Sequence, residues 1–87
     1  MYVIIVYDVS VERVNKVCQF LKKYLNWIQN SVFEGELSEG ELKKVEIGLK
    51  EIINHNEDSI LIYSFQKEKM VEKNHIGIKK AEQSFII

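Results

Sequence analysis

The chain opens with Tyr2-Val3-Ile4-Ile5-Val6-Tyr7, an unbroken run of β-branched and aromatic residues that ends on the acid Asp8. A run of this kind is typical of a central strand that is buried on both faces. The carboxylate that follows would be held at the end of a rigid strand and would still reach solvent. Taken alone, Asp8 is most simply interpreted as a cap of the next turn, because Asp is favoured at such positions.

Apolar residues at helical spacing predict two amphipathic helices. The first is predicted after Ser10, whose hydroxyl is expected to accept from the first free backbone N–H groups of the helix. Its apolar positions are Val14, Val17, Cys18, Leu21 and Leu25. The second helix is predicted after Ser38, which forms a capping box with Glu41. Its apolar positions are Leu42, Val45, Leu49, Ile52 and Ile53.

The remaining segments read as strands, turns and a tail. Residues 26–37 predict either two short strands or one long bent strand, with a bulge or bend expected at Gly35. Residues 59–65 predict a second buried strand, and residues 67–69 a polar turn. Residues 71–78 predict a last strand at a sheet edge, and residues 81–87 a tail that ends in apolar side chains.

This order of elements predicts an α+β domain with a ferredoxin-like βαββαβ sandwich. Its antiparallel sheet would carry two helices on one face and an extra C-terminal strand. The 87 residues of the chain form a single domain on this interpretation. A chain this short buries a limited share of its surface, and its apolar end needs a partner surface. A second copy of the chain would bury more of this surface and would cover the apolar end.

Composition narrows the classes of protein that need to be considered. One cysteine, Cys18, excludes an intramolecular disulfide and indicates a buried, inert thiol in a reducing cytoplasm. No apolar run approaches the length of a membrane span, and no cleavable signal precedes the first strand. The net charge of −1 argues against a strong general binder of nucleic acid, but the charge is uneven. Residues 34–58 hold eight acids against three lysines, whereas the flanking segments are basic.

Few residues could carry chemistry. His55 and His75 have no second ligand at zinc-binding spacing, and the chain contains no nucleophile motif or phosphate-binding loop. Phe33 and Trp27 could stack on bases, although core packing is the simpler interpretation. One carboxylate is a poor Mg²⁺ site, but a two-fold axis near Asp8 would bring two carboxylates together. A shared divalent ion would relieve their repulsion and could activate a water for attack on a phosphodiester.

Two segments together resemble a known family. The opening segment, residues 2–9, and the segment Ile28-Gln29-Asn30-Ser31-Val32-Phe33-Glu34-Gly35 lie one helix apart. At this spacing the chain is similar over its whole length to the small CRISPR-associated adaptation protein, the second core protein of that system, often described as its endoribonuclease. The resemblance includes the closing stretch at Ile76 and Gly77.

The resemblance implies a prokaryotic, cytoplasmic homodimer that bridges two dimers of the CRISPR integrase. This assembly captures DNA fragments and inserts them as new spacers. The resemblance also implies that residues 70–87, the C-terminal strand and tail, are exchanged between protomers. Several relatives are Mg²⁺-dependent endonucleases on single-stranded RNA or double-stranded DNA, and others act only as scaffolds.

The resemblance also assigns residues. Asp8 would be the metal ligand and catalytic acid, with one Mg²⁺ shared by the Asp8 pair of the dimer. Tyr7 and Phe33 fall on motif positions near that site. DNA would be held by a set of basic residues, Arg13, Lys16, Lys22 and Lys23, which the dimer duplicates. Trp27 stands where many relatives have Arg, which removes one cation that could hold a phosphate.

Three alternatives stay open. The first is a catalytically silent DNA-binding scaffold in which Asp8 only shapes the centre of the dimer. The second is a toxin-like RNase of the same fold, and the third is a small-molecule-sensing domain of the same fold. The sensing domain would need a ligand cleft at the dimer interface.

Overall fold

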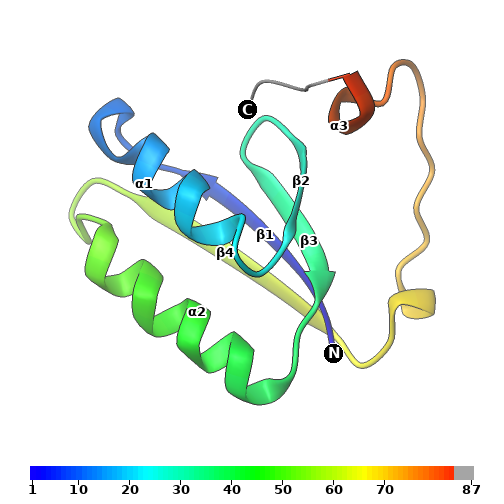
Figure 1. Cartoon of the computed structure of the whole chain (residues 1–87), viewed down its shortest axis with the longest axis horizontal. Helices are drawn as coiled ribbons and strands as arrows, with labels where there is room; N and C mark the ends of the chain where they lie inside the picture. Colours follow the sequence, from blue (N-terminus) through cyan, green and yellow to red (C-terminus); the bar gives the residue numbers. More distant parts are fainter. Residues whose placement is uncertain (84–87) are drawn as a thin grey trace.

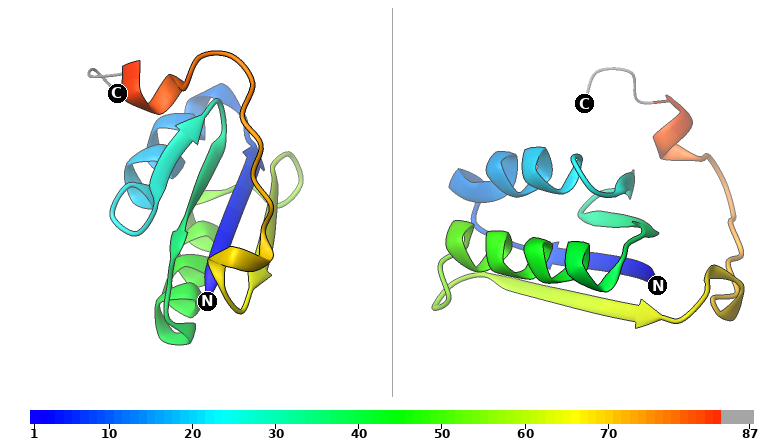
Figure 2. Two further views of the ribbon diagram at one scale, coloured as in Figure 1. Left: turned by 90° about the vertical axis from the view of Figure 1, so that its right-hand side faces the viewer. Right: turned by 60° about the horizontal axis from the view of Figure 1, so that its bottom comes forward.

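The elements of the chain follow the predicted order (Figure 1). The computed structural model describes residues 1–83. It contains β1 (Tyr2–Asp8), α1 (Val11–Leu21), β2 (Asn26–Gln29), β3 (Val32–Glu36), α2 (Glu39–Ile52), β4 (Ser59–Phe65), the 3₁₀ turn η1 (Glu68–Met70) and the short α3 (Lys80–Gln83). The strands form one antiparallel sheet in the order β2-β3-β1-β4. Helices α1 and α2 contact each other and lie on the same face of this sheet (Figure 2), which confirms the predicted ferredoxin-like sandwich.

The central strand β1 has one buried face and one partly exposed face. Val3, Ile5 and Tyr7 are buried beneath the helices, with exposed fractions of 0%, 0% and 5%. Ile4 and Val6 alternate with them on the opposite side, which we call the open face, and are only half-buried. The prediction of a strand buried on both faces is therefore wrong for this chain by itself, because both helices cover the same side of the sheet.

The core forms between the helices and the sheet. Its fully buried side chains come from β1, from Phe33 on β3, from Val17 and Leu21 on α1, and from Val45 on α2. The capping box that begins α2 is confirmed, since Glu41 N–H donates to Ser38 Oγ at 3.1 Å and Ser38 N–H to Glu41 Oε1 at 2.9 Å. At α1 the expected side-chain cap is not formed.

Residues 26–37 form two short strands rather than one bent strand. The turn between them includes Asn30, whose φ of 44° is a left-handed conformation that Asn tolerates better than most residues. The irregularity in the pairing lies between Trp27 and Gln29 and not at the expected Gly35. Gly35 instead lies inside β3, where an added Cβ would be 3.2 Å from Leu25 Cδ2. The absence of a side chain at Gly35 therefore lets Leu25 pack close to β3.

The sequence prediction fails most clearly at β4 and beyond. Strand β4 lies at the edge of the sheet and is half exposed instead of buried. Residues 66–83, which we call the C-terminal arm, contain η1 and α3 but no strand, so the extra C-terminal strand is absent from the described part of this single chain. The expected polar turn at residues 67–69 largely coincides with η1. The tail residues 84–87 lie outside the described residues.

Candidate functional site

Asp8 lies at the end of β1 on the open face. Its side chain is exposed and shares this face with Ile4 and Val6, because alternate residues of a strand point to the same side. Its register partner on β4 is Ser59. Among residues 1–83, no ion pair engages the Asp8 carboxylate, and no cluster of three His, Cys, Asp or Glu side chains could hold a metal ion. The carboxylate is therefore free to bind a cation, but one chain supplies only one such ligand.

Tyr7 and Phe33 lie on the other side of the sheet from Asp8. Their rings stack with centroids 6.2 Å apart, and both belong to the core. Burial raises the pKa of the Tyr7 phenol, so it stays neutral and protonated. The Tyr7 backbone N–H also donates to Ser31 O at 3.1 Å. The structure thus places both aromatic residues where they can fix the backbone beside Asp8 but where their rings do not face solvent.

Arg13 is held by two acids from the loop that precedes β4. Its Nε donates to Asp58 Oδ2 at 2.6 Å and its Nη2 to Glu57 Oε2 at 2.7 Å. The Asp58 side chain is fully buried and also accepts from the backbone N–H groups of Ser10 and Asn54, each at 2.9 Å. The Arg13 guanidinium and these N–H groups hold the pKa of Asp58 well below its usual range.

The predicted nucleic-acid-binding lysines lie in the helical layer. Lys16 is on α1, and Lys22 and Lys23 follow directly after it; Lys16 and Lys23 are exposed, and Lys22 is half-buried. Asp8 is on the opposite, open face of the sheet. Within one chain the structure therefore brings the three lysines into one region, but it does not bring them to Asp8.

A polar cluster on the open face was missed by the sequence analysis. The Tyr2 hydroxyl donates to Glu34 Oε2, and the Lys73 ammonium donates to Glu34 Oε2 at 2.7 Å and to Glu68 Oε2 at 3.0 Å. Lys73 also lies over the Tyr2 ring, 4.8 Å from its centroid. The hydrogen bond to Glu34 raises the pKa of Lys73 well above its ordinary value. This cluster, which we call the Lys73 anchor, ties the C-terminal arm to the sheet.

The fold and the site define a class: a ferredoxin-like α+β domain with one exposed acid at the end of its central strand. Comparison with protein families narrows this class. A family model described as "CRISPR associated protein Cas2" matches residues 1–73. The chain belongs to this family.

Individual relatives agree with this assignment. A protein named CRISPR-associated endoribonuclease Cas2 from Methanosarcina acetivorans is 53% identical, and the match covers 100% of both chains. A second protein of that name, from Pyrococcus furiosus, is 51% identical over 92% of both chains. A crystal structure of Cas2 superposes with a TM-score of 0.86 at 50% identity, covering 100% of this chain and 98% of the other. The Streptococcus pyogenes Cas2 structure at pH 6.5 has a TM-score of 0.73 at 31% identity, covering 86% and 100%.

No helix among residues 1–83 is long and apolar enough to cross a membrane.

Proposed function

We propose that this protein is a nuclease subunit of a CRISPR system and that it acts as a homodimer. The family match and the endoribonuclease names of the relatives support the nuclease class. The observation that carries the proposal is the position of Asp8, an exposed carboxylate at the rim of a sheet face that one chain covers only in part. The toxin-like RNase and the sensing domain have no comparable support.

The open face is the proposed contact between the two copies. Two of its side chains on β4, Leu61 and Tyr63, are 53% and 49% exposed. Ile4 and Val6 of β1 lie next to them in the register, at positions Ile4↔Tyr63 and Val6↔Leu61. Four neighbouring apolar side chains on the part of a sheet face that the Lys73 anchor does not cover are the kind of surface that a second sheet covers. A two-fold axis through this face would repeat every contact and would bring two copies of Asp8 to one interface.

The Asp8 pair would hold the metal ion. An exposed carboxylate with no competing ion pair among residues 1–83 fits the oxygen ligands that Mg²⁺ prefers, and two of them fit the usual one or two carboxylates per ion. When bound, Mg²⁺ would polarise a phosphoryl oxygen and lower the pKa of a coordinated water. Tyr7 and Phe33 would act by holding the end of β1 in place, with their rings inside the core.

Nucleic acid would approach from the basic parts of the dimer. Lys16, Lys22 and Lys23 are the proposed contacts, and the second copy doubles their number. Arg13 would contribute least, because Asp58 and Glu57 already neutralise its charge. The further proposals follow the resemblance: the dimer bridges two integrase dimers during spacer acquisition in a prokaryotic cytoplasm, and residues 70–87 are exchanged between protomers.

Cleavage by an Asp8 variant tests the proposal. Wild type, Asp8→Asn and the control Glu12→Gln, which removes the next acid along the chain, are incubated with Mg²⁺ and either single-stranded RNA or double-stranded DNA. We expect wild type and Glu12→Gln to cleave one of these substrates and Asp8→Asn to lose at least 100-fold in rate, roughly the scale of a lost catalytic carboxylate. Equal cleavage by Asp8→Asn would contradict the metal site. Spacer acquisition that survives Asp8→Asn would favour the silent scaffold.

A further inference from the structure

A buried ion pair joins the two loops that lie beside Asp8, the loop between β1 and α1 and the loop between α2 and β4. Asp58 Oδ1 accepts from the Ser10 backbone N–H at 2.9 Å and from Arg13 Nη2 at 3.2 Å. Asp58 Oδ2 accepts from the Asn54 backbone N–H at 2.9 Å and from Arg13 Nε at 2.6 Å. One fully buried carboxylate therefore holds both loops and the first turn of α1 together. We call this arrangement the Arg13–Asp58 clamp.

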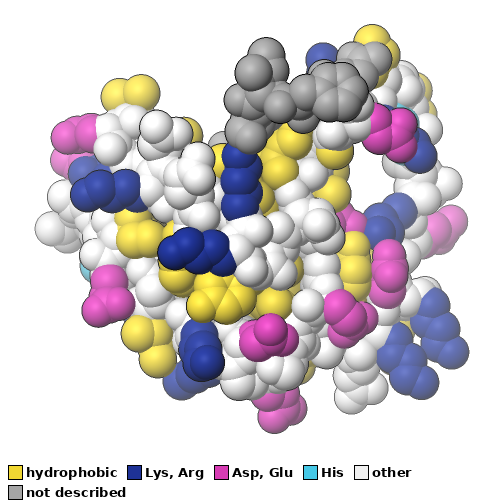
Figure 3. Space-filling model, in the orientation of Figure 1, with side chains coloured by type: hydrophobic (Ala, Val, Ile, Leu, Met, Phe, Trp, Pro, Cys, Tyr) yellow, Lys and Arg dark blue, Asp and Glu magenta, His cyan; other side chains and the backbone are white. Residues whose placement is uncertain are grey.

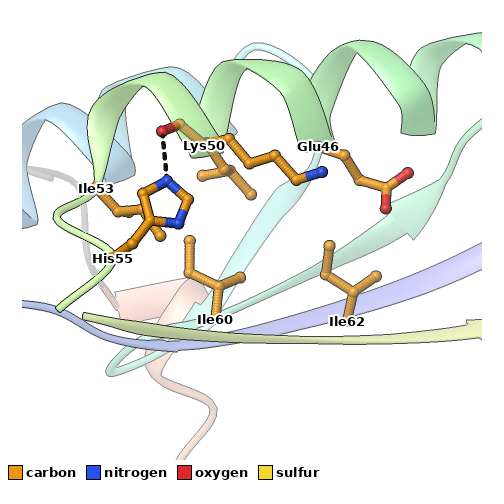
Figure 4. A pocket seen from close by; sticks show the side chains of 7 residues that line it. Glu46, Lys50, Ile53, His55, Ile60 and Ile62 are labelled. Atoms are coloured by element: carbon orange, nitrogen blue, oxygen red, sulfur yellow. Dashed lines mark hydrogen bonds between the residues drawn. The ribbon is translucent and has the colours of Figure 1, made fainter. Parts of the chain in front are cut away.

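The loop between α2 and β4 gives the clamp a fixed base. Within this loop the backbone N–H groups of Asp58 and Glu57 donate to Asn54 O at 2.8 Å and 3.1 Å. Figure 4 shows the His55 ring of the same loop beneath the C-terminal end of α2, where its Nε2 donates to Lys50 O at 3.1 Å. These contacts keep the backbone of the loop, and with it Asp58, in a fixed position relative to α2.

The clamp lies directly next to the register pair of Asp8 and Ser59. Ser10 follows Asp8 by two residues, and Asp58 immediately precedes Ser59. The hydrogen bond from the Ser10 N–H to Asp58 therefore joins β1 to β4 just beyond the last pair of the two strands. The end of β1 cannot move relative to β4 without breaking this bond. The clamp thus acts on the backbone that carries Asp8 and leaves the Asp8 carboxylate exposed.

A metal ion that two copies of Asp8 share requires this rigidity. Mg²⁺ demands near-ideal octahedral geometry with oxygen ligands at about 2.0–2.1 Å. The side chains of such a site must be held within about 0.5 Å of their productive positions. A shift of Asp8 away from a two-fold axis occurs in both copies, so it widens the gap between the two carboxylates by about twice its size. Loosening of β1 would therefore disturb a shared site more than a site within one chain.

The surroundings of Arg13 fit this role better than contact with nucleic acid. Two carboxylates, Asp58 and Glu57, already bind its guanidinium, and its side chain is only 18% exposed. Figure 3 shows acidic and basic side chains mixed over the molecule, without a continuous basic patch in this view. Arg13 is thus neutralised where it lies, and its charge is used within the fold.

We propose that Arg13 and Asp58 are positioning residues for the metal site. Their ion pair holds the end of β1 so that the Asp8 carboxylates of two copies meet at one ion. Neither residue contacts the ion or the nucleic acid. This inference rests on the proposed dimeric site and names the residues that set its geometry.

Mn²⁺ binding to the dimer, measured by electron paramagnetic resonance, tests this role. Wild type is compared with Asp58→Asn, with the double variant Arg13→Met and Asp58→Asn, and with the control Glu57→Gln. An Asn side chain has one acceptor oxygen and presents N–H groups at its other position, so it can hold only one of the two loops. We expect the dissociation constant for Mn²⁺ to rise at least about tenfold in Asp58→Asn and in the double variant, the lower end of what loss of a supporting partner costs. Glu57→Gln is expected to bind Mn²⁺ as wild type does.

These variants separate positioning from charge. Asp58→Asn and Glu57→Gln each remove one negative charge, whereas the double variant keeps the net charge of wild type. A purely electrostatic effect on Mn²⁺ would weaken binding in both single variants and restore it in the double variant. That result would overturn the proposal.

The same variants separate positioning from stability. Each constant is measured at a temperature where circular dichroism shows a folded chain and sedimentation shows a dimer, so a lower thermal midpoint alone does not change it. The double variant replaces both partners and leaves no buried charge unpaired, which favours folding. If wild type binds Mn²⁺ and the folded double variant binds it equally well, the clamp is overturned and the Asp8 site stands. If wild type binds no Mn²⁺, the proposed metal site fails and this inference fails with it.

Discussion

The buried carboxylate of Asp58 ties the start of α1 to the loop that precedes β4. It accepts from Arg13, Ser10 and Asn54, so it fixes the chain on both sides of the Asp8–Ser59 register pair. Because the folded pKa of Asp58 lies far below its value of about 3.9 in an unfolded chain, its charge stabilises the fold above that pH. The stabilisation is lost progressively as the pH falls below about 4 toward the folded pKa.

The loss of thermal stability in Asp58→Asn should therefore depend on pH. We expect a lower thermal midpoint than wild type at pH 7, and a difference that narrows steadily as the pH falls below about 4. Thermal unfolding followed by circular dichroism between pH 7 and pH 2 measures it. Glu57→Gln is the matched control, because Glu57 binds the same guanidinium but is 57% exposed, so its loss should matter little. A difference of the same size at pH 7 and pH 2 would show that the charge of Asp58 is not the cause.

Single residues were predictable only where the local pattern carries the information. The opening strand predicts that Asp8 ends it, and the structure places Asp8 there, exposed. Alternation along that strand also puts the Tyr7 ring on the opposite face from Asp8. Arg13 and Asp58 are 45 residues apart in the sequence, so no local sequence pattern predicts that they form an ion pair. Glu34 left little signal, because β3 holds two glutamates and the cation that binds Glu34, Lys73, is 39 residues away.

Helices α1 and α2 meet at a glycine. An added Cβ at Gly48 would lie 2.1 Å from Phe20 Cζ and within 2.9 Å of two more ring atoms. Ala in place of Gly inside a helix normally gains about 1 kcal/mol, but forcing a group into a packed contact costs about 1–3 kcal/mol. We expect Gly48→Ala to lower the free energy of unfolding by ~1 kcal/mol, as measured by urea denaturation.

Gly40→Ala gives the matched control for this contact. Gly40 lies in the first turn of the same helix, and the nearest atom to an added Cβ is Ser38 Oγ at 4.0 Å. Its replacement should be neutral or stabilising. Phe20→Leu in the Gly48→Ala background should recover stability if the ring is the obstacle. Stabilisation by Gly48→Ala comparable to that by Gly40→Ala would mean that the ring moves aside without cost.

Elements were predictable from periodicity, but their environments were not. The apolar spacing predicts both helices, and the capping box marks the start of α2 correctly. The same apolar composition predicts that β1 and β4 are equally buried, yet β1 is central and β4 is at the edge. The order of the strands depends on which strands pair in the folded chain. A short stretch of sequence does not contain that information. Residues 71–78, predicted as an edge strand, form no strand in the described chain, because a strand forms only where a neighbouring edge pairs with it.

At the scale of the whole molecule, a second copy of the chain would explain why the observed burial of β1 and β4 differs from the burial that the sequence predicts. Among residues 1–83 the apolar open face is only partly covered and the outer edge of β4 has no neighbouring strand, and a two-fold partner would cover both. Covering the open face would also restore the two-sided burial that the β1 sequence predicts. Composition alone supports a dimer only in general terms, since it cannot say which face is covered.

The stoichiometry of metal binding tests the central claim most directly. Mn²⁺ substitutes for Mg²⁺ at oxygen ligands and can be counted by electron paramagnetic resonance. For the sedimenting dimer, the account predicts one tightly bound Mn²⁺ per two chains in wild type and none in Asp8→Asn. One ion per chain, or equal binding by an Asp8→Asn dimer, would contradict a metal site shared by the Asp8 pair.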